Sequence, residues 1–237
     1  MLRIRTALAV GLTLVGLTGV ASAQTVDEVI KKHIDAIGGK EAWAKVTGMR
    51  MEGSVMAQGT EVDLTMSRVL HTGSRVDISV MGMSGYRIMT PTEGWSYMPF
   101  QGQQAPEAMT ADDIKQGQDE LLDPGDPFVR MTENGTKAEL VGKEEIEGTD
   151  CFKVKLTYKS GKVTTAFIDS KNYYCIRQSS KVKANGQEME IASDFSNFKK
   201  LPEGVTVPMT IGSPMGSVDM KKVEINPKLD DNVFKKS

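Results

Sequence analysis

The sequence has few of the residues on which most enzymes and metal centres depend. Only two histidines and two cysteines occur among its 237 residues, and no zinc-protease, paired-cysteine, nucleophile-elbow, phosphate-loop or dinucleotide-binding glycine motif is present. A zinc site or a histidine-driven triad needs partners that this chain scarcely has. Carboxylates from distant strands remain an open route to glycoside hydrolysis, but we expect a protein that is not an enzyme and uses no metal or cofactor.

The scarcity of cysteine argues against a disulfide-rich scaffold, and the small net charge argues against a nucleic-acid-binding protein. Two cysteines cannot hold together a chain of this length, so its stability must come from a buried core. The 29 Lys and Arg are mixed along the chain with 31 Asp and Glu, which argues against a nucleic-acid partner.

No hydrophobic run has the length of a membrane span. Arg3 and Arg5 precede an apolar stretch broken by glycine (residues 7–20), and Ala21-Ser22-Ala23 fits a signal-peptidase site. We therefore expect residues 1–23 to be a signal peptide. Residues 24–237 would then form one soluble periplasmic domain, a monomer without a transmembrane segment.

Alternating residues between Cys151 and Ile211 predict a long antiparallel meander with one apolar face. The expected turns are Ser160-Gly161, residues 169–172, Asn185-Gly186 and residues 201–204. A two-residue loop at Ser160-Gly161 would pair Lys159 with Lys162. It would also place Val154, Leu156 and Tyr158 on the same side as Val163, Thr165 and Phe167.

The first half of the chain also has strand periodicity. Apolar residues alternate in several runs between Met49 and Phe100, the last expected strand running from Trp95 to Phe100, with turns expected at Gln58-Gly59, Thr72-Gly73 and Ser84-Gly85. Ten methionines lie between Met49 and Met131. Methionine either fills an irregular core or lines a pocket for a ligand of variable shape, and both interpretations stay open.

Two helices are expected outside the strands. At the N-terminus, Thr25 and Glu28 form a capping box before an apolar stripe that ends at Gly38-Gly39, and His33 beside this stripe is best explained as a half-buried helix residue. Thr110 caps a second helix that interrupts the strands. This inserted helix is either a movable cover over the sheet or an ordinary packed connection.

Several short motifs resemble the outer-membrane lipoprotein-sorting proteins, which are similar to the periplasmic lipoprotein carriers of the LolA/LolB-like superfamily. The motifs are Ala36-Ile37-Gly38-Gly39 with Trp43, Gly94-Trp95 with Pro99-Phe100-Gln101-Gly102, Val141-Gly142-Lys143-Glu144, Ile168-Asp169, and Ile225-Asn226-Pro227 with Asp230-Asp231 and Phe234. The resemblance implies a mainly β (α+β) fold: a curved antiparallel sheet forming an incompletely closed barrel, with an N-terminal helix and an inserted helix covering its concave apolar face.

The resemblance also implies a function. A carrier of this type would bind the acyl chains of lipoproteins or other lipids in a hydrophobic cavity during outer-membrane biogenesis. The residues expected to line such a cavity are Met51, Met66, Ile78, Met89, Trp95, Met98, Phe100, Phe152, Val154, Leu156 and Phe167. The alternative is a non-enzymatic envelope module that grips a partner protein on the same curved sheet.

The strand register makes a prediction about the two cysteines. In an oxidising compartment a Cys151–Cys175 bridge is the default expectation. The expected hairpins place Cys151 opposite Ser170 and Cys175 opposite Ile168, with both thiols on the outer face and a whole strand between them. Two strand spacings amount to about 9.6 Å, beyond the ~7 Å that a disulfide tolerates. We therefore expect no bridge between them.

Overall fold

The computed structural model describes residues 24–184, 187–214 and 216–236. The expected signal peptide (residues 1–23) and the expected Asn185-Gly186 turn lie outside the described residues. The helices are α1 (Val26–Ala36), α2 (Lys40–Ala44), α3 (Ala111–Gly117) and α4 (Met131–Asn134), with 3₁₀ turns η1 (Pro99–Gln101) and η2 (Gln118–Leu121). The strands are β1 (Gly48–Ala57), β2 (Thr60–Val69), β3 (Gly73–Val80), β4 (Met83–Met89), β5 (Gly94–Tyr97), β6 (Glu107–Ala108), β7 (Lys137–Ile146), β8 (Thr149–Thr157), β9 (Val163–Asp169), β10 (Cys175–Ala184), β11 (Gln187–Ser196), β12 (Lys199–Lys200), β13 (Thr206–Val207), β14 (Thr210–Ser213) and β15 (Gly216–Ile225).

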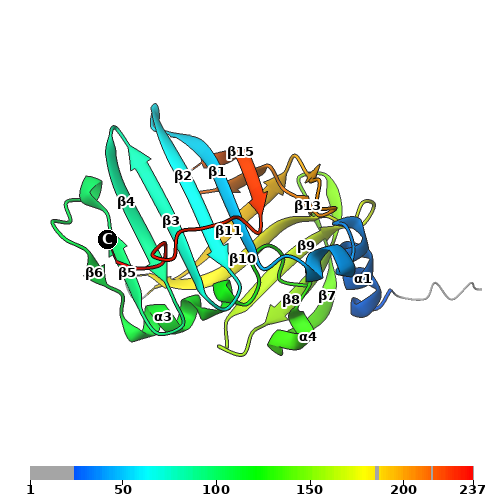
Figure 1. The fold of residues 1–237 in the computed structure, drawn as a ribbon. Helices are drawn as coiled ribbons and strands as arrows, with labels where there is room; N and C mark the ends of the chain where they lie inside the picture. Colours follow the sequence, from blue (N-terminus) through cyan, green and yellow to red (C-terminus); the bar gives the residue numbers. More distant parts are fainter. Residues whose placement is uncertain (1–23, 185–186, 215, 237) are drawn as a thin grey trace, which may run out of the picture.

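One strongly curved antiparallel sheet makes up most of the structure (Figure 1). Its 13 strands follow the order β6-β5-β4-β3-β2-β1-β15-β14-β11-β10-β9-β8-β7. Among the described residues the edge strands β6 and β7 do not pair with each other, so the sheet is not closed. The predicted fold class, a mainly β half-barrel with an N-terminal and an inserted helix, is confirmed.

Helix α1 closes one end of the concave face. Its sequence supplies both a capping signal that starts the helix and an apolar stripe that packs on the sheet. The Thr25 side chain accepts from the Glu28 backbone N–H and the Glu28 carboxylate accepts from the Thr25 N–H, as predicted. The stripe buries Val29 and Ile30 against the sheet. The core so formed contains Val29, Ile30, Phe128, Phe152, Val154, Leu156, Ala166, Ile168 and Cys175.

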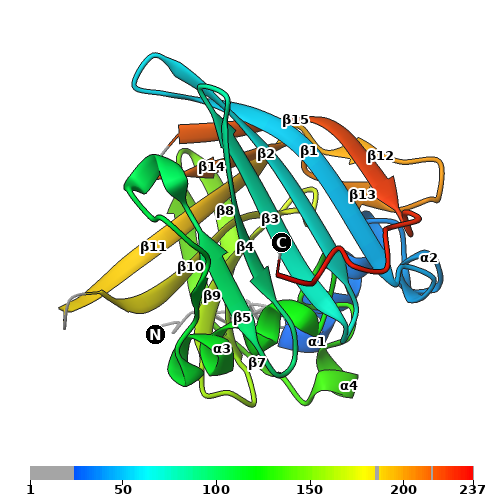
Figure 2. The same cartoon turned by 60° about the vertical axis from the view of Figure 1, so that its left-hand side comes forward.

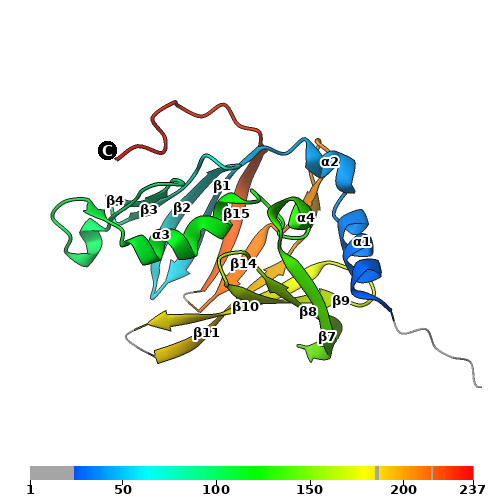
Figure 3. The same ribbon diagram turned by 90° about the horizontal axis from the view of Figure 1, so that it is seen from below.

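The inserted helix α3 begins with a second capping box, in which Thr110 and Asp113 exchange hydrogen bonds. Figure 3 shows α3 on one side of strands β1–β4 and the C-terminal tail on the other. The Phe234 ring lies on Gly73, where an added Cβ would come within 2.5 Å of it, and Arg75 Nη1 donates to the Val233 carbonyl at 3.1 Å. Phe234 therefore anchors the tail to the sheet.

The predicted β8–β9 register is wrong by one residue. Thr157, rather than Lys159, is the last residue of β8 to pair, and it lies opposite Val163. In the longer loop the Ser160 hydroxyl donates to Asp119 and accepts from the Lys162 N–H. A one-residue shift turns side chains to the opposite face, so Phe167 pairs with Lys153 and packs away from the concave core, beside Ile146 and Cys151.

Two boundaries in the first half also differ from expectation. The β3–β4 turn consists of Met81-Gly82, while Ser84 and Gly85 lie within β4. Strand β5 ends at Tyr97, and Phe100 belongs to η1 because Pro99 starts a 3₁₀ turn.

Both cysteines are free, as predicted, but for a different reason. Cys151 lies opposite Asp169, not Ser170, and packs with Phe167 on the outer side. Cys175 lies opposite Ile168 as expected, yet it belongs to the concave core. The two thiols therefore lie on opposite faces of the sheet.

Candidate functional site

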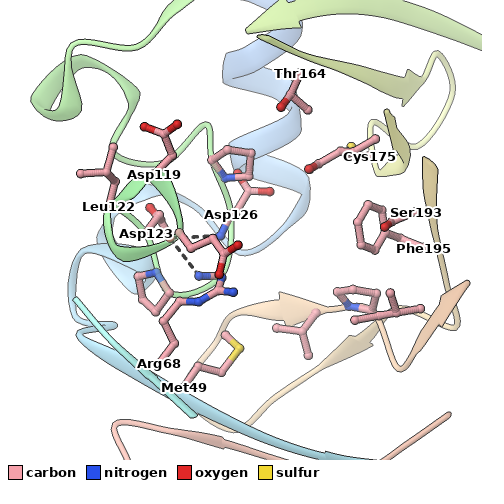
Figure 4. Close-up of a pocket in the computed structure, with 18 of the residues that line it drawn as sticks. Met49, Arg68, Asp119, Leu122, Asp123, Asp126, Thr164, Cys175, Ser193 and Phe195 are labelled. Atoms are coloured by element: carbon pink, nitrogen blue, oxygen red, sulfur yellow. Dashed lines mark hydrogen bonds between the residues drawn. The ribbon is translucent and has the colours of Figure 1, made fainter. Parts of the chain in front are cut away.

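A cavity of about 540 Å³ lies on the concave side of the sheet. Strands β1 and β2 form one wall and strands β9, β10, β11 and β14 the other, and residues 118–127 lie over the space between them (Figure 4). We call residues 118–127 the cover segment. A cavity of this size can hold a small amphiphile or one acyl chain.

The β1–β2 wall is apolar apart from Arg68. Met51 lies directly opposite Met66 and Met49 opposite Arg68, so alternation along both strands aims these four side chains into the cavity. Trp43 from α2 closes the inner end, held by a hydrogen bond from its Nε1 to the Ile37 carbonyl at 3.0 Å.

The opposite wall is more polar and opens outward. Thr164, Gln178, Ser180 and Ser193 line it alongside apolar residues of β11 and β14. Ile191 is among the lining residues and is 42% exposed. The cavity therefore runs from the buried Trp43 end to a mouth at β11.

The cover segment is tied to the rest of the fold by its four carboxylates. Asp119 accepts from the Ser160 hydroxyl at 2.5 Å, Glu120 lies 3.7 Å from Arg87, Asp123 lies 3.9 Å from Arg130, and Asp126 lies 3.0 Å from His33. These partners come from the β8–β9 loop, β4, the start of α4 and α1. Polar contacts to four separate elements thus hold the cover segment over the cavity.

Burial changes the acidity of two of these carboxyl groups. Desolvation raises the pKa of Asp119, against the lowering effect of its hydrogen bond from Ser160. Desolvation raises the pKa of Asp123 to about 6, although Asp123 accepts hydrogen bonds from the backbone N–H groups of Gly125 and Asp126 at 3.0 Å. The cover segment therefore contains one carboxyl group, that of Asp123, that titrates in mild acid.

His33 is fully buried rather than half-buried. Its Nδ1 lies 2.7 Å from the Tyr173 carbonyl oxygen and its Nε2 lies 3.0 Å from an Asp126 carboxylate oxygen. Burial alone lowers its pKa, but the charge of Asp126 and the two hydrogen bonds outweigh burial and raise the pKa. This ring joins α1 to the cover segment.

Arg68 is the cationic side chain of the apolar wall. Its Nε is buried, and none of the described residues offers it a hydrogen-bond partner. A guanidinium in this position makes the cavity amphipathic, suited to a ligand with both an apolar and a polar part.

The structure brings together two of the eleven predicted residues, Met51 and Met66, in the cavity wall. Three others, Ile78, Met98 and Phe100, lie on the same face of the sheet but outside the cavity. The side chains of Met98 and Phe100 approach Gly85, and Gly85 pairs with Ile78. Met89 is buried under Gly117 of α3.

The remaining predicted residues lie elsewhere. Phe152, Val154 and Leu156 are on the concave face but fill the core beneath α1. Trp95 points to the opposite face, since its neighbour Gly94 pairs with Met89, and Lys236 of the tail lies 4.3 Å from its ring. Phe167 is on the outer face. Whether any of the eleven contacts a ligand stays a prediction.

Sequence reasoning missed Trp43, Met49, Arg68 and the acidic cover segment. Met49 and Arg68 stand two residues from Met51 and Met66, so the strand period alone would have placed them on the same face. No sequence pattern indicates the contacts of the cover segment, because most of them join residues that are distant in the sequence.

No group of three His, Cys, Asp or Glu side chains within the described residues could hold a metal ion. In the same part of the chain, no helix combines the length and apolarity required to cross a membrane.

Comparisons with known proteins identify the fold. No protein-family model matches the chain, and no curated protein matches it. A LolA superfamily protein from Nitrosomonas europaea, NE2245, is similar over 90% of this chain and 99% of its own, with 15% identity and a TM-score of 0.55. A DUF1329 family protein from Desulfovibrio piger covers 90% and 98%, with 14% identity and a TM-score of 0.54. A putative outer membrane lipoprotein-sorting protein domain from Vibrio parahaemolyticus covers 88% and 95%, with 12% identity and a TM-score of 0.49.

At these identities the likeness concerns the fold. The chain has the LolA-like fold that the sequence motifs suggested.

Proposed function

We propose that this protein is a periplasmic, non-enzymatic carrier that binds the acyl chains of lipoproteins or other lipids and takes part in outer-membrane lipoprotein sorting. The observation that carries the proposal is the covered cavity, whose inner wall includes the apolar side chains of Trp43, Met49, Met51 and Met66. Its occurrence in a fold shared with a LolA superfamily protein supports the same function. Export through the expected signal peptide would bring the chain to such cargo.

The cavity can supply the affinity that a carrier needs. Each acyl CH₂ group moved from water into apolar surroundings contributes ~0.8 kcal/mol. Burial of about ten such groups would contribute roughly 8 kcal/mol before the cost of immobilising the ligand is subtracted. Methionine side chains adapt to chains of different length at little cost.

The cover segment supports reversible binding. The Glu120–Arg87 and Asp119–Ser160 contacts near its start are only half-buried, and water can replace such contacts when that end of the segment lifts. Release of cargo would then not require the apolar core beneath α1 to be disrupted.

Binding of a fluorescent fatty-acid probe tests the proposal. Met66→Trp adds volume to the cavity wall and is expected to weaken probe binding at least tenfold while the melting temperature changes by only a few degrees. Met81→Trp is the matched control, because Met81 is 80% exposed at the β3–β4 turn.

No probe binding by the wild type would contradict the proposal and favour the alternative, an envelope module that grips a partner protein. Equal weakening by both variants would show that the probe does not occupy this cavity.

A further inference from the structure

Strand β11 has an unpaired edge beside the cavity mouth. On one side it pairs with β10 from Gln187 to Asp194. On the other side it pairs with β14 only through Asp194, Phe195 and Ser196. Among the described residues, 188–193 therefore have no strand on that side, and Figure 2 shows the β10–β11 hairpin extending past β14.

This edge has few of the features that usually prevent another strand from adding to a sheet. Native edges are protected by bulges, by proline and by charged side chains, above all lysine, and the charged residues here are Glu188 and Glu190. The edge strand β7 has a bulge at Gly142 and alternating charges. Residues 188–193 (Glu-Met-Glu-Ile-Ala-Ser) contain no lysine or proline, and their pairing with β10 runs without a register shift.

The side chains of this edge differ between its two faces. Met189 and Ile191 are 53% and 42% exposed and share the face of Ser193 and Phe195, which line the cavity. Glu188 and Glu190 are exposed on the other face. A strand added here would be about 16 Å long over five residues, with apolar side chains toward the mouth and basic ones opposite the glutamates.

We propose that this edge binds the extended polypeptide next to the acylated end of a cargo protein, while the acyl chain occupies the cavity. The preferred segment alternates apolar and basic residues. Backbone hydrogen bonds to every second residue of 188–193, whose N–H and C=O groups face away from β10, provide affinity, and the alternating side chains provide specificity. The inference rests on the proposed acyl-binding function and narrows its ligand from lipids in general to lipopeptides.

The first experiment compares three synthetic ligands on the wild-type protein: palmitic acid, an N-palmitoylated peptide of alternating Val and Lys, and the same lipopeptide with Glu in place of Lys. We expect the Val/Lys lipopeptide to bind at least tenfold more tightly than palmitic acid. In hydrogen exchange it should slow those amides of residues 188–193 that face away from β10, whereas palmitic acid leaves them unchanged.

The second experiment reverses the charge of the edge. Glu188→Lys with Glu190→Lys should weaken binding of the Val/Lys lipopeptide about fivefold, from two cross-strand charge pairs, and strengthen binding of the Val/Glu lipopeptide. Glu145→Lys, an exposed glutamate on β7, is the matched control and should change neither.

The outcomes separate the two proposals. No palmitic acid binding contradicts acyl binding itself. Palmitic acid binding without any gain from the peptide, or with no protection of residues 188–193, overturns the edge proposal alone. If protection of these amides depends on the protein concentration and not on the lipopeptide, the edge binds a second copy of the chain. That result would also overturn the edge proposal.

Discussion

Replacement of Asp126 by asparagine tests the buried contact that joins the cover segment to α1. The His33 side chain is 1% exposed and the Asp126 side chain 13% exposed, with Nε2 and Oδ2 3.0 Å apart. The carbonyl oxygen of Tyr173 can only accept, so Nδ1 of His33 must donate to it. Because the Asp126 carboxylate also accepts, the ring is held in its doubly protonated form.

The pH dependence follows from this geometry. Asp126 and the hydrogen bonds raise the pKa of His33 above its ordinary value in spite of burial. A raised folded-state pKa stabilises the fold fully at pH values below the unfolded value of about 6.5, and this contribution is lost as the pH rises through the folded value. Asp126→Asn removes the charge but keeps a side chain that can hydrogen-bond to a neutral ring.

The expected cost is greatest in mild acid. A buried hydrogen bond between charged groups contributes about 1.5–3 kcal/mol, so Asp126→Asn should lower the free energy of unfolding by about 2 kcal/mol at pH 5.5. The loss should be distinctly smaller at pH 9, where His33 has lost more of its charge. Urea unfolding at both pH values measures the difference, and an NMR titration of the two histidines should show a lowered pKa for His33 in the variant. His71, exposed on the β2–β3 turn, provides a reference signal.

An equal loss of stability at both pH values would refute the charged pair and leave only a packing contact. An unchanged His33 titration in the variant would do the same.

Three further predictions concern the cover segment, the thiols and the tail. Desolvation raises the pKa of Asp123 to about 6, so ionisation of this carboxyl group destabilises the fold as the pH rises from ~4 to ~6. Relative to Asp123→Asn, the wild type should lose about 2–3 kcal/mol of its free energy of unfolding as the pH rises through that range in denaturant titrations. Burial raises the pKa of Cys151 to about 11 and that of Cys175 to about 12; unreduced protein should therefore show no thiol reactive toward a disulfide reagent in its native state and two in denaturant, and a denatured monomer with none would contradict the strand order. Gly73→Ala should expel the Phe234 ring, cost ~1–3 kcal/mol and expose the tail to limited proteolysis; in a Phe234→Ala background the same change should have little effect, and an additive effect would show that the contact is unimportant.

The sequence alone determined the local features of this protein. Thr25 with Glu28 and Thr110 with Asp113 form capping boxes from residues three positions apart, so both helices could be located without the structure. Alternation with a period of two identified most strands, because that period is a property of the extended backbone. It also placed Met51 and Met66 on one face.

Tertiary contacts decided what each face is used for. Phe152 and Met51 both lie on the concave side of the sheet. Helix α1 and Phe128 cover Phe152, whereas Met51 borders the cavity. A contact between Ser160 and Asp119, 41 residues apart, accompanies the longer β8–β9 loop and the outward turn of Phe167. Periodicity records which side chains share a face but not what packs against them, since that depends on contacts between segments distant in the sequence. For this reason the cavity, its cover segment and the unpaired edge of β11 became visible only in the folded chain.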